Sequence, residues 1–260
     1  MARPQPQALV GATLGGRYIL EKFIGSGAFA WVYLAKEPGG AKVAVKVLQN
    51  ATEEARKLFT REIKVLRQLP KSQFCVSYVD DGLTNDGVPF LVMEFVDGAT
   101  LKDTFKFQPV WEAEEGCQLM VQLCEALAGL HQLGLAHRDL KPENVMLTRT
   151  WKVKLMDFGL VKDAQGLLKL FETEDIVSGR DFAENIDKAL LAGTPEYMAP
   201  EQFSDPLVED EALARTDTWT DVYSLGLIFS EILTGKKLFP LKTKAKTSDE
   251  YTKDLFDYIR

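Results

Sequence analysis

The stretch AHRDLKPENVML, residues 136–147, places an acid, an amine and an amide close together. Pro142 lacks the backbone N–H that a helix interior needs, so the stretch is predicted to be a loop. Asp139 and Lys141 would face the same way in an extended chain, and Asn144 offers a neutral oxygen ligand for a hard cation. A carboxylate that accepts a hydroxyl proton, an ammonium that holds a phosphoryl oxygen and an amide that helps to bind Mg²⁺ together favour phosphoryl transfer.

This chemistry would also need a second metal ligand and a cation for the other phosphates. The sequence VKLMDFG supplies Asp157 at the end of a predicted strand. In KVAVKVL, residues 42–48, the period of two puts Ala44 and Lys46 on one face, where the small Ala leaves room for a flat ring. An inward Lys needs an anion, and Glu62 on the following helix is the natural candidate. The alternatives are an edge Lys and a surface Glu, which add little to stability.

The string IGSGAFAWVY, residues 24–33, carries Gly25 and Gly27 between two predicted strands. Strands on both sides argue against a Rossmann turn, in which a helix must follow the glycines. The glycines are therefore predicted to lie in a hairpin whose backbone N–H groups approach an anion closely, because no Cβ stands in the way. An ordinary Gly-rich turn is the alternative.

Short β-type runs dominate up to about residue 96 and predict a small, mainly β lobe. The predicted strands are RYILEKFI, WVYLAK, KVAVKVL and PFLVMEFV, which begin at residues 17, 31, 42 and 89. One predicted helix, residues 52–70, interrupts them and ends at Pro70. Its apolar stripe consists of Leu58 or Phe59, Ile63, Leu66 and Leu69.

After FVDGAT, residues 95–100, the pattern becomes helical and predicts a larger α lobe. One helix is expected over residues 111–134. Its apolar stripe consists of Cys117, Met120, Cys124 and Leu127. A second helix, residues 221–235, is apolar nearly all round and is expected to be buried in a helical body. The fold class is therefore predicted to be α+β, and a cleft between two lobes is a favoured place for a small ligand.

The composition limits the function classes. The chain has 260 residues, of which 46% are hydrophobic, enough for a buried core. A net charge of −7 argues against general nucleic-acid binding, which depends on clustered Lys and Arg. The longest candidate for a membrane span, SLGLIFSEILTG, is interrupted by Glu231 and is shorter than the roughly 20 residues that a bilayer needs. No signal peptide is visible, and 3 cysteines without a CxxC pair favour a reducing cytoplasm.

The glycine hairpin, strand Lys, helix Glu, HRDxxxxN and DFG follow one another in the order found in the eukaryotic-type (Hanks) protein kinases. The chain resembles that family from about Arg17 to at least Gly235, and HRDLKPEN with DFG and GTPEYMAPE is highly specific for it. The resemblance implies a two-lobed fold with an N-terminal tail over 1–16, an antiparallel β N-lobe with one main helix and the hinge over 17–96, and a mainly α C-lobe over 97–260. It also implies ATP and Mg²⁺ as cofactors.

The resemblance assigns a role to each candidate site residue. The residues implied for catalysis are the base Asp139, the γ-phosphate contact Lys141, the α/β-phosphate contact Lys46 and its ion-pair partner Glu62. The implied metal ligands are Asn144 and Asp157. The residues implied for adenine are the gatekeeper Met93, the hinge residues Glu94 and Val96, and the apolar residues Ile24, Val32, Ala44 and Met146. The residues implied for support are His137, Phe158 and Leu66 of a stacked spine, Asp221 as anchor of the catalytic loop, and His131 as a structural helix-end residue.

The same comparison narrows the substrate class. Lys141, together with Thr194 in GTPEYMAPE, resembles Ser/Thr kinases, because tyrosine kinases usually carry Ala or Arg at the position of Lys141. The residues within and around the motifs, such as GRYILEKFIGSG and YMAPEQF, resemble those of bacterial members of the family. Small-molecule kinases of the aminoglycoside type share HxDxxxxN but usually lack the APE segment. The resemblance therefore implies transfer to Ser or Thr of protein substrates, with autophosphorylation. Ala30 replaces the third glycine of the loop, a common variation that should leave nucleotide binding intact.

The segment between DFG and APE departs from the family pattern. Arg138 resembles the residue that pairs with an activation-loop phosphate. Residues 179–193 nevertheless contain no Ser, Thr or Tyr, although phosphosites usually fall there. The candidates for a phosphosite are Thr173 and Ser178, and those for an acid that replaces the phosphate are Glu184 and Asp187. We favour the acid, which would give partial activity without phosphorylation; a disordered loop with solvated acids is the other interpretation.

The end of the sequence also departs from the pattern. The family's last helices, and the Arg that pairs with Glu201 of APE, have no counterpart up to Arg260. The resemblance then implies either a truncated chain, or apolar surface on the C-lobe that a partner or a second copy covers. A nucleotide-binding pseudokinase or interaction scaffold is the rival function. The complete set Lys46, Glu62, Asp139, Asn144 and Asp157 argues against it.

Overall fold

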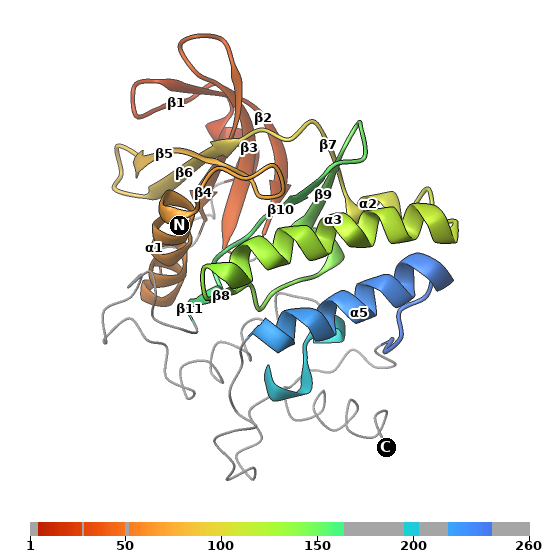
Figure 1. Cartoon of the computed structure of the whole chain (residues 1–260). Helices are drawn as coiled ribbons and strands as arrows, with labels where there is room; N and C mark the ends of the chain where they lie inside the picture. The colour runs from red at the N-terminus through yellow and green to blue at the C-terminus, as the bar shows by residue number, and fades with distance from the viewer. Residues whose placement is uncertain (1–4, 28, 50–51, 164–194, 203–217, 241–260) are drawn as a thin grey trace. The chain divides into compact units, whose positions relative to one another are not determined.

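The computed structural model describes residues 5–27, 29–49, 52–163, 195–202 and 218–240. The chain divides into two compact units, Met1–Asp97 and Gly98–Arg260. The described part of the first unit is an antiparallel sheet with one main helix, and that of the second is mainly helical (Figure 1). The predicted fold class is therefore confirmed.

Unit 1 contains a six-stranded antiparallel sheet with the order β1-β2-β3-β4-β6-β5. Its strands are β1 (Thr13–Leu14), β2 (Tyr18–Ser26), β3 (Ala30–Lys36), β4 (Lys42–Leu48), β5 (Tyr78–Leu83) and β6 (Pro89–Glu94). Strand β5 was not predicted, because its sequence YVDDGL lacks the apolar alternation of a strand. It forms as the edge strand beside the apolar β6, with Asp81 opposite Leu91 and Leu83 opposite Pro89.

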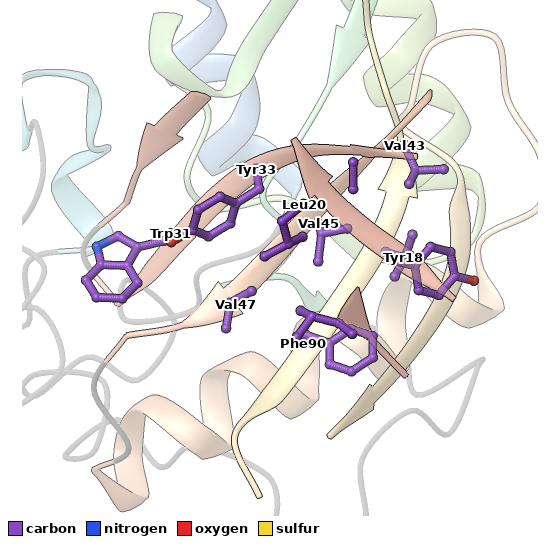
Figure 2. Close-up of a cluster of buried hydrophobic side chains, with 11 residues drawn as sticks. Tyr18, Leu20, Trp31, Tyr33, Val43, Val45, Val47 and Phe90 are labelled. Carbon is purple, nitrogen blue, oxygen red and sulfur yellow. The ribbon is translucent and has the colours of Figure 1, made fainter. Parts of the chain in front are cut away.

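The two faces of β4 have different surroundings. Val43, Val45 and Val47 belong to the buried core cluster, which Figure 2 shows together with Tyr33, Leu20 and Phe90 of the same cluster. Ala44 and Lys46 lie on the opposite face, where Ala44 stands opposite Met93 of β6 and Lys46 opposite Val32 of β3. The predicted separation of the Lys46 face from the valine face is confirmed.

Helix α1 (Glu53–Gln68) packs on this sheet through β4, β5 and β6. Thr52 caps its N-terminus, since the Thr52 Oγ1 accepts a hydrogen bond from Ala55 N at 3.3 Å. Phe59, Ile63 and Leu66 are buried, as the stripe predicted. Glu62, which is 4% exposed, is buried with them.

Residues 5–16, which we expected to precede the sheet as a tail, pack against it. The short 3₁₀ helix η1 (Pro6–Leu9) contacts β2, and Leu9 packs on the core cluster. The Tyr33 hydroxyl donates to Pro6 O at 2.8 Å, and burial raises the pKa of Tyr33 to about 12. Strand β1 then pairs with β2, so this segment is part of unit 1.

In unit 2 the long helices α3 (Ala113–Gln132) and α5 (Thr218–Thr234) pack against each other. Gly116 marks a close approach, since a β-carbon there would lie 3.1 Å from Ile232 Cγ2. The shorter elements are β7 (Gly98–Thr100), α2 (Leu101–Thr104), β8 (Leu135–Ala136), η2 (Pro142–Asn144), β9 (Val145–Thr148), β10 (Val153–Leu155), β11 (Lys162–Asp163), η3 (Pro195–Tyr197) and η4 (Pro200–Gln202). The strands form two small sheets, β10-β9-β7 and β11-β8.

Two helix predictions need correction. Cys117 and Cys124 are exposed, so the predicted stripe of α3 was wrong at these two positions, whereas Leu127 is buried as predicted. The buried stripe of α3 consists of Gly116, Leu119, Leu123, Ala126, Leu127 and Leu130. Helix α5 is not buried on all sides either, because Trp219 and Val222 are 72% and 47% exposed.

None of the helices in the described ranges has the length and apolar character required to cross a bilayer.

Candidate active site

The glycine string forms the predicted hairpin. Strands β2 and β3 pair with Gly25 opposite Val32, and Gly27 N donates to Ala30 O at 2.8 Å. Neither Gly25 nor Gly27 has a positive φ. Among the described residues, a β-carbon at Gly25 would meet no atom within 4 Å, and one at Gly27 would meet only Ala30 O at 4.0 Å. The hairpin therefore does not itself require glycine, which favours the anion-binding interpretation over an ordinary turn.

We expect Gly25→Ala and Gly27→Ala to leave the fold intact and to weaken ATP binding. Each methyl group fits the ligand-free hairpin, so the melting temperature should change by less than about 2 °C. The same methyl groups would hinder close approach of phosphates to the backbone N–H groups, and the Kd for ATP in calorimetric titration should rise by about tenfold, or about 1.4 kcal/mol.

Gly98→Ala is the matched control, because a β-carbon at Gly98 would lie 1.9 Å from Leu147 O. This variant should lose stability. Unchanged ATP affinity in both hairpin variants would instead assign Gly25 and Gly27 to an ordinary turn.

Lys46 and Glu62 form the expected ion pair within unit 1. The Lys46 Nζ lies 2.8 Å from both Glu62 Oε1 and Glu62 Oε2. Their side chains are only 12% and 5% exposed. The surface-charge alternative is therefore wrong for both residues. Removing either partner of such a buried pair leaves a buried charge, which typically costs about 3–5 kcal/mol.

The residues implied for adenine binding are distributed over both units. Ala44, Met93 and Val96 of unit 1 are buried, Val32 is half-buried, and Ile24 is 43% exposed.

Glu94 and Met146 are fixed by backbone pairing. The Glu94 N–H donates to Ser77 O at 2.9 Å, so this N–H is already bonded. Met146 belongs to unit 2, where it lies in β9 opposite Thr100. The adenine-binding roles stay predictions.

A buried carboxylate on α5 holds the start of the loop that carries Asp139. Asp221 Oδ2 accepts from His137 N at 2.8 Å, and Asp221 Oδ1 accepts from Arg138 N at 2.7 Å. His131 Nε2, in the last turn of α3, lies 2.8 Å from Asp221 Oδ2. Asp221 is fully buried and Arg138 has a φ of 64°. These contacts agree with the anchoring role expected for Asp221 and the structural role expected for His131.

The loop brings Asp139, Lys141 and Asn144 together as their spacing predicted. Lys141 Nζ donates to Asp139 Oδ1 at 2.8 Å and to Oδ2 at 2.9 Å. Asn144 Nδ2 donates to Asp139 Oδ2 and to the Asp139 backbone O, both at 2.8 Å. Among the described residues, Asp139 Oδ1 accepts a hydrogen bond from Lys141 alone. One lone pair of Oδ1 is therefore available for a further donor. The amide nitrogen of Asn144 is used, so its Oδ1 is the atom suited to a cation.

Asp157 reaches the same region through a β-hairpin. Strands β9 and β10 pair with Leu155 opposite Val145, and Met156 N extends the pairing by donating to Asn144 O at 2.9 Å. Asp157 follows with a φ of 65°, a conformation that is uncommon outside glycine and is often found at functional sites.

The electrostatics of Lys141 reflect this arrangement. Burial alone would lower the pKa of Lys141, but the charge and hydrogen bonds of Asp139, and then the charges of Asp157 and Glu143, raise it above its usual value. Lys141 therefore remains an ammonium at neutral pH. The Asp157 carboxylate is close enough to contribute to this shift.

Two residues expected to belong to the spine pack against each other in unit 2, with their ring planes tilted by 57°. The rings of His137 and Phe158 have centroids 5.4 Å apart, and both side chains are fully buried. His137 Nε2 also lies 3.1 Å from Met156 O. Leu66 is buried in unit 1, and its part in a spine stays a prediction.

The segment 195–202 is bound to α5 by contacts that the sequence did not predict. Tyr197 Oη donates to Glu231, Ser224 Oγ donates to Tyr197 O at 2.7 Å, and Thr220 Oγ1 donates to Glu201 Oε1 at 3.0 Å. Burial raises the pKa of Tyr197 above its usual value. Burial also raises the pKa of Glu231, although the hydrogen bond from Tyr197 acts in the opposite direction and lowers it. Glu201 was expected to pair with an Arg that has no counterpart in this sequence, and among the described residues Thr220 contacts its carboxylate instead. The hydroxyl group of Thr220, next to a largely apolar helical stretch, is the sequence signal that could have identified this contact.

The regulatory candidates Thr173, Ser178 and Thr194, and the acids Glu184 and Asp187, lie outside the described residues. Arg138, their expected partner, is 7% exposed. Its pairing with a phosphate or an acid stays a prediction.

Comparison with known proteins gives a consistent picture. The family model described as protein kinase domain matches residues 18–259. The chain is 34% identical over 234 residues to a probable serine/threonine-protein kinase of Streptomyces coelicolor, covering 87% of this chain and 31% of that protein. It is 34% identical over 242 residues to serine/threonine-protein kinase pkn2 of Myxococcus xanthus, covering 90% of this chain and 26% of that protein.

A third relative is serine/threonine-protein kinase PknB of Mycobacterium leprae. The identity is 33% over 232 residues, covering 87% of this chain and 34% of that protein. The chain thus spans at most 34% of the length of these three relatives.

Proposed function

Because this chain belongs to the protein kinase family, we propose that it transfers the γ-phosphate of ATP to Ser or Thr hydroxyls of protein substrates. The observation that carries the proposal is the Asp139 carboxylate, which both the Lys141 ammonium and the Asn144 amide hold in place. The names of the three relatives support the choice of Ser and Thr. Autophosphorylation and a cytoplasmic location, where its cysteines would stay free thiols, belong to the same proposal.

Unit 2 would carry out the transfer. Asp139 would accept the hydrogen bond, and then the proton, of the substrate hydroxyl on Oδ1. Lys141 stays charged because its pKa is raised, so it would hold an oxygen of the γ-phosphate. Most of the rate enhancement would come from positioning and from charge stabilisation by groups that are already in place.

Mg²⁺ fits the donors of Asn144 and Asp157. This ion is usually held by one or two carboxylates together with phosphates and water. Asn144 and Asp157 offer one amide and one carboxylate, so phosphate oxygens of ATP and water would complete the coordination of the ion. When bound, it would neutralise charge on those phosphates.

Unit 1 would hold the nucleotide. The backbone N–H groups around Gly25 and Gly27 would bind phosphate oxygens, and Lys46, oriented by Glu62, would bind the α- and β-phosphates. The face of the sheet that carries Ala44 and Met93 would contact the adenine.

The proposal is tested by incubating the purified chain with Mg²⁺ and γ-labelled ATP and locating label by mass spectrometry. We expect label on Ser or Thr. In Lys46→Met the rate should fall by about 10²-fold, since a phosphate-binding cation is lost. The melting temperature should also fall, because Glu62 loses the cation that lies 2.8 Å from it.

Lys42→Met is the matched control, because it removes the same charge from the exposed start of the same strand. It should retain the wild-type rate. If the wild-type chain transfers no label while ATP still raises its melting temperature, the pseudokinase or scaffold function is the correct one.

A further inference from the structure

Arg138 has a backbone conformation that needs support. Its φ of 64° places a non-glycine residue in the left-handed region, which costs energy and persists only where the surroundings enforce it. Asp139 follows directly in the chain. A change in the two peptide groups of Arg138 would therefore move the carboxylate that we assign as the base.

The two peptide groups of Arg138 are held from different elements. On the N-terminal side, Arg138 N donates to Asp221 Oδ1 of α5 at 2.7 Å. On the C-terminal side, Arg138 O accepts from Gln202 Nε2 at 2.8 Å. Gln202 lies at the end of η4 and is 1% exposed. The left-handed turn is thus held by Asp221 on its N-terminal side and by Gln202 on its C-terminal side, where Asp139 N also donates a longer hydrogen bond to His137 Nδ1 at 3.3 Å.

Gln202 is itself oriented by a second hydrogen bond. Its Oε1 accepts from Ala199 N at 3.0 Å, so the amide nitrogen has to point towards Arg138. A buried amide that uses both its oxygen and its nitrogen in this way has a defined orientation. We propose that Gln202 is a positioning residue for phosphoryl transfer, because it fixes the Arg138 carbonyl and thereby the direction in which Asp139 leaves the turn.

A purely structural role, as an anchor of the segment 195–202, is less consistent with the contacts. That segment is already attached to α5 by Ser224 to Tyr197 O, by Thr220 to Glu201 and by Tyr197 to Glu231. Loss of Gln202 would leave these bonds in place. It would remove only the bond to Arg138 and the bond to Ala199 within the segment.

The inference rests on the proposed function, and kinetics with a protein substrate provide its first test. Gln202→Met keeps the length of the side chain but neither donates nor accepts as the amide does. We expect kcat to fall by about tenfold, the effect of one misdirected hydrogen bond near the reacting group. The KM for ATP should change by less than about twofold, since the nucleotide contacts lie elsewhere.

Gln202→Glu is a sharper variant. Its carboxylate still accepts from Ala199 N but cannot donate to Arg138 O, so kcat at neutral pH should fall at least as far as in Gln202→Met. When the pH is lowered through the pKa of the new carboxyl group, the protonated acid can donate again. The ratio of variant to wild-type kcat should then rise, and no such rise should occur for Gln202→Met.

Ser224→Ala is the matched control, because it removes a bond to the same segment that does not involve Arg138. It should lower the melting temperature and leave kcat within about twofold of wild type. If Gln202→Met keeps a wild-type kcat, or if kcat falls equally in Ser224→Ala, Gln202 is a structural residue and the inference is wrong.

Hydrogen exchange separates this outcome from failure of the proposed function. Gln202→Met should speed amide exchange in peptides that cover residues 137–140, and Ser224→Ala should not. This comparison needs no activity. If the wild-type chain transfers no phosphate, only the proposed function is refuted. If Gln202→Met leaves amide exchange at residues 137–140 unchanged, the positioning role of Gln202 is refuted.

Discussion

Asp139→Asn is expected to lower kcat by about 10²–10⁴-fold, the usual contribution of a general base, while ATP binding stays nearly intact. An amide is a far weaker base than a carboxylate, so at neutral pH it does not accept the proton of a substrate hydroxyl. It is nearly isosteric with the carboxylate and keeps an oxygen for Lys141 Nζ. The nucleotide contacts that we propose lie mainly in unit 1 and should not change.

The measurement combines steady-state kinetics with the shift of melting temperature on addition of ATP and Mg²⁺. Asp103→Asn removes the same charge from a side chain on α2 that is 48% exposed, and it should leave kcat unchanged. If Asp139→Asn transferred phosphate at the wild-type rate, the base would have to be another residue.

The candidate site could be predicted where its contacts are local or follow a period. Asp139 and Asn144 are near neighbours in sequence, so the loop alone brings their side chains to 2.8 Å. Lys46 could be placed because a strand alternates strictly between two faces. Its pairing with Glu62 followed from the need of a buried ammonium for an anion.

The contacts that fix the Arg138 turn could not be predicted in the same way. Gln202 and Asp221 are separated from Arg138 by 64 and 83 residues, and no period or motif connects them. Such contacts depend on how α5 and the segment 195–202 are placed in the fold. The resemblance suggested Asp221, but it gave no indication of Gln202.

The misplaced stripe of α3 has a simpler cause. Cysteine is classed as an apolar residue, so the predicted stripe from Cys117 to Leu127 has the same helical spacing as the stripe that is buried in the structure. The leucines and Gly116 determine the buried face instead, because Gly116 lets Ile232 of α5 approach closely. Exposing a cysteine on a helix surface costs little stability, whereas exposing the leucines would lose the free energy gained by burying their larger apolar side chains.

Asp221→Asn is expected to have the second large effect, on both stability and rate. The carboxylate accepts from His137 N with one oxygen and from Arg138 N with the other. An amide has one oxygen, so its NH₂ group would have to face one of these buried N–H donors. Hydrogen bonds to a charged group contribute about 1.5–3 kcal/mol, and an unsatisfied buried donor adds a penalty.

A loss of about 3 kcal/mol corresponds to a fall in melting temperature of about 6–12 °C for a chain of this size. The rate should fall as well, even at temperatures where the variant is folded, because the left-handed turn at Arg138 loses its N-terminal support and Asp139 is no longer directed. His131→Phe is the control, since it removes the ring nitrogen 2.8 Å from Asp221 but neither backbone bond. It should cost much less in melting temperature and in kcat. Equal losses in the two variants would mean that Asp221 acts through His131 rather than through the backbone of the loop.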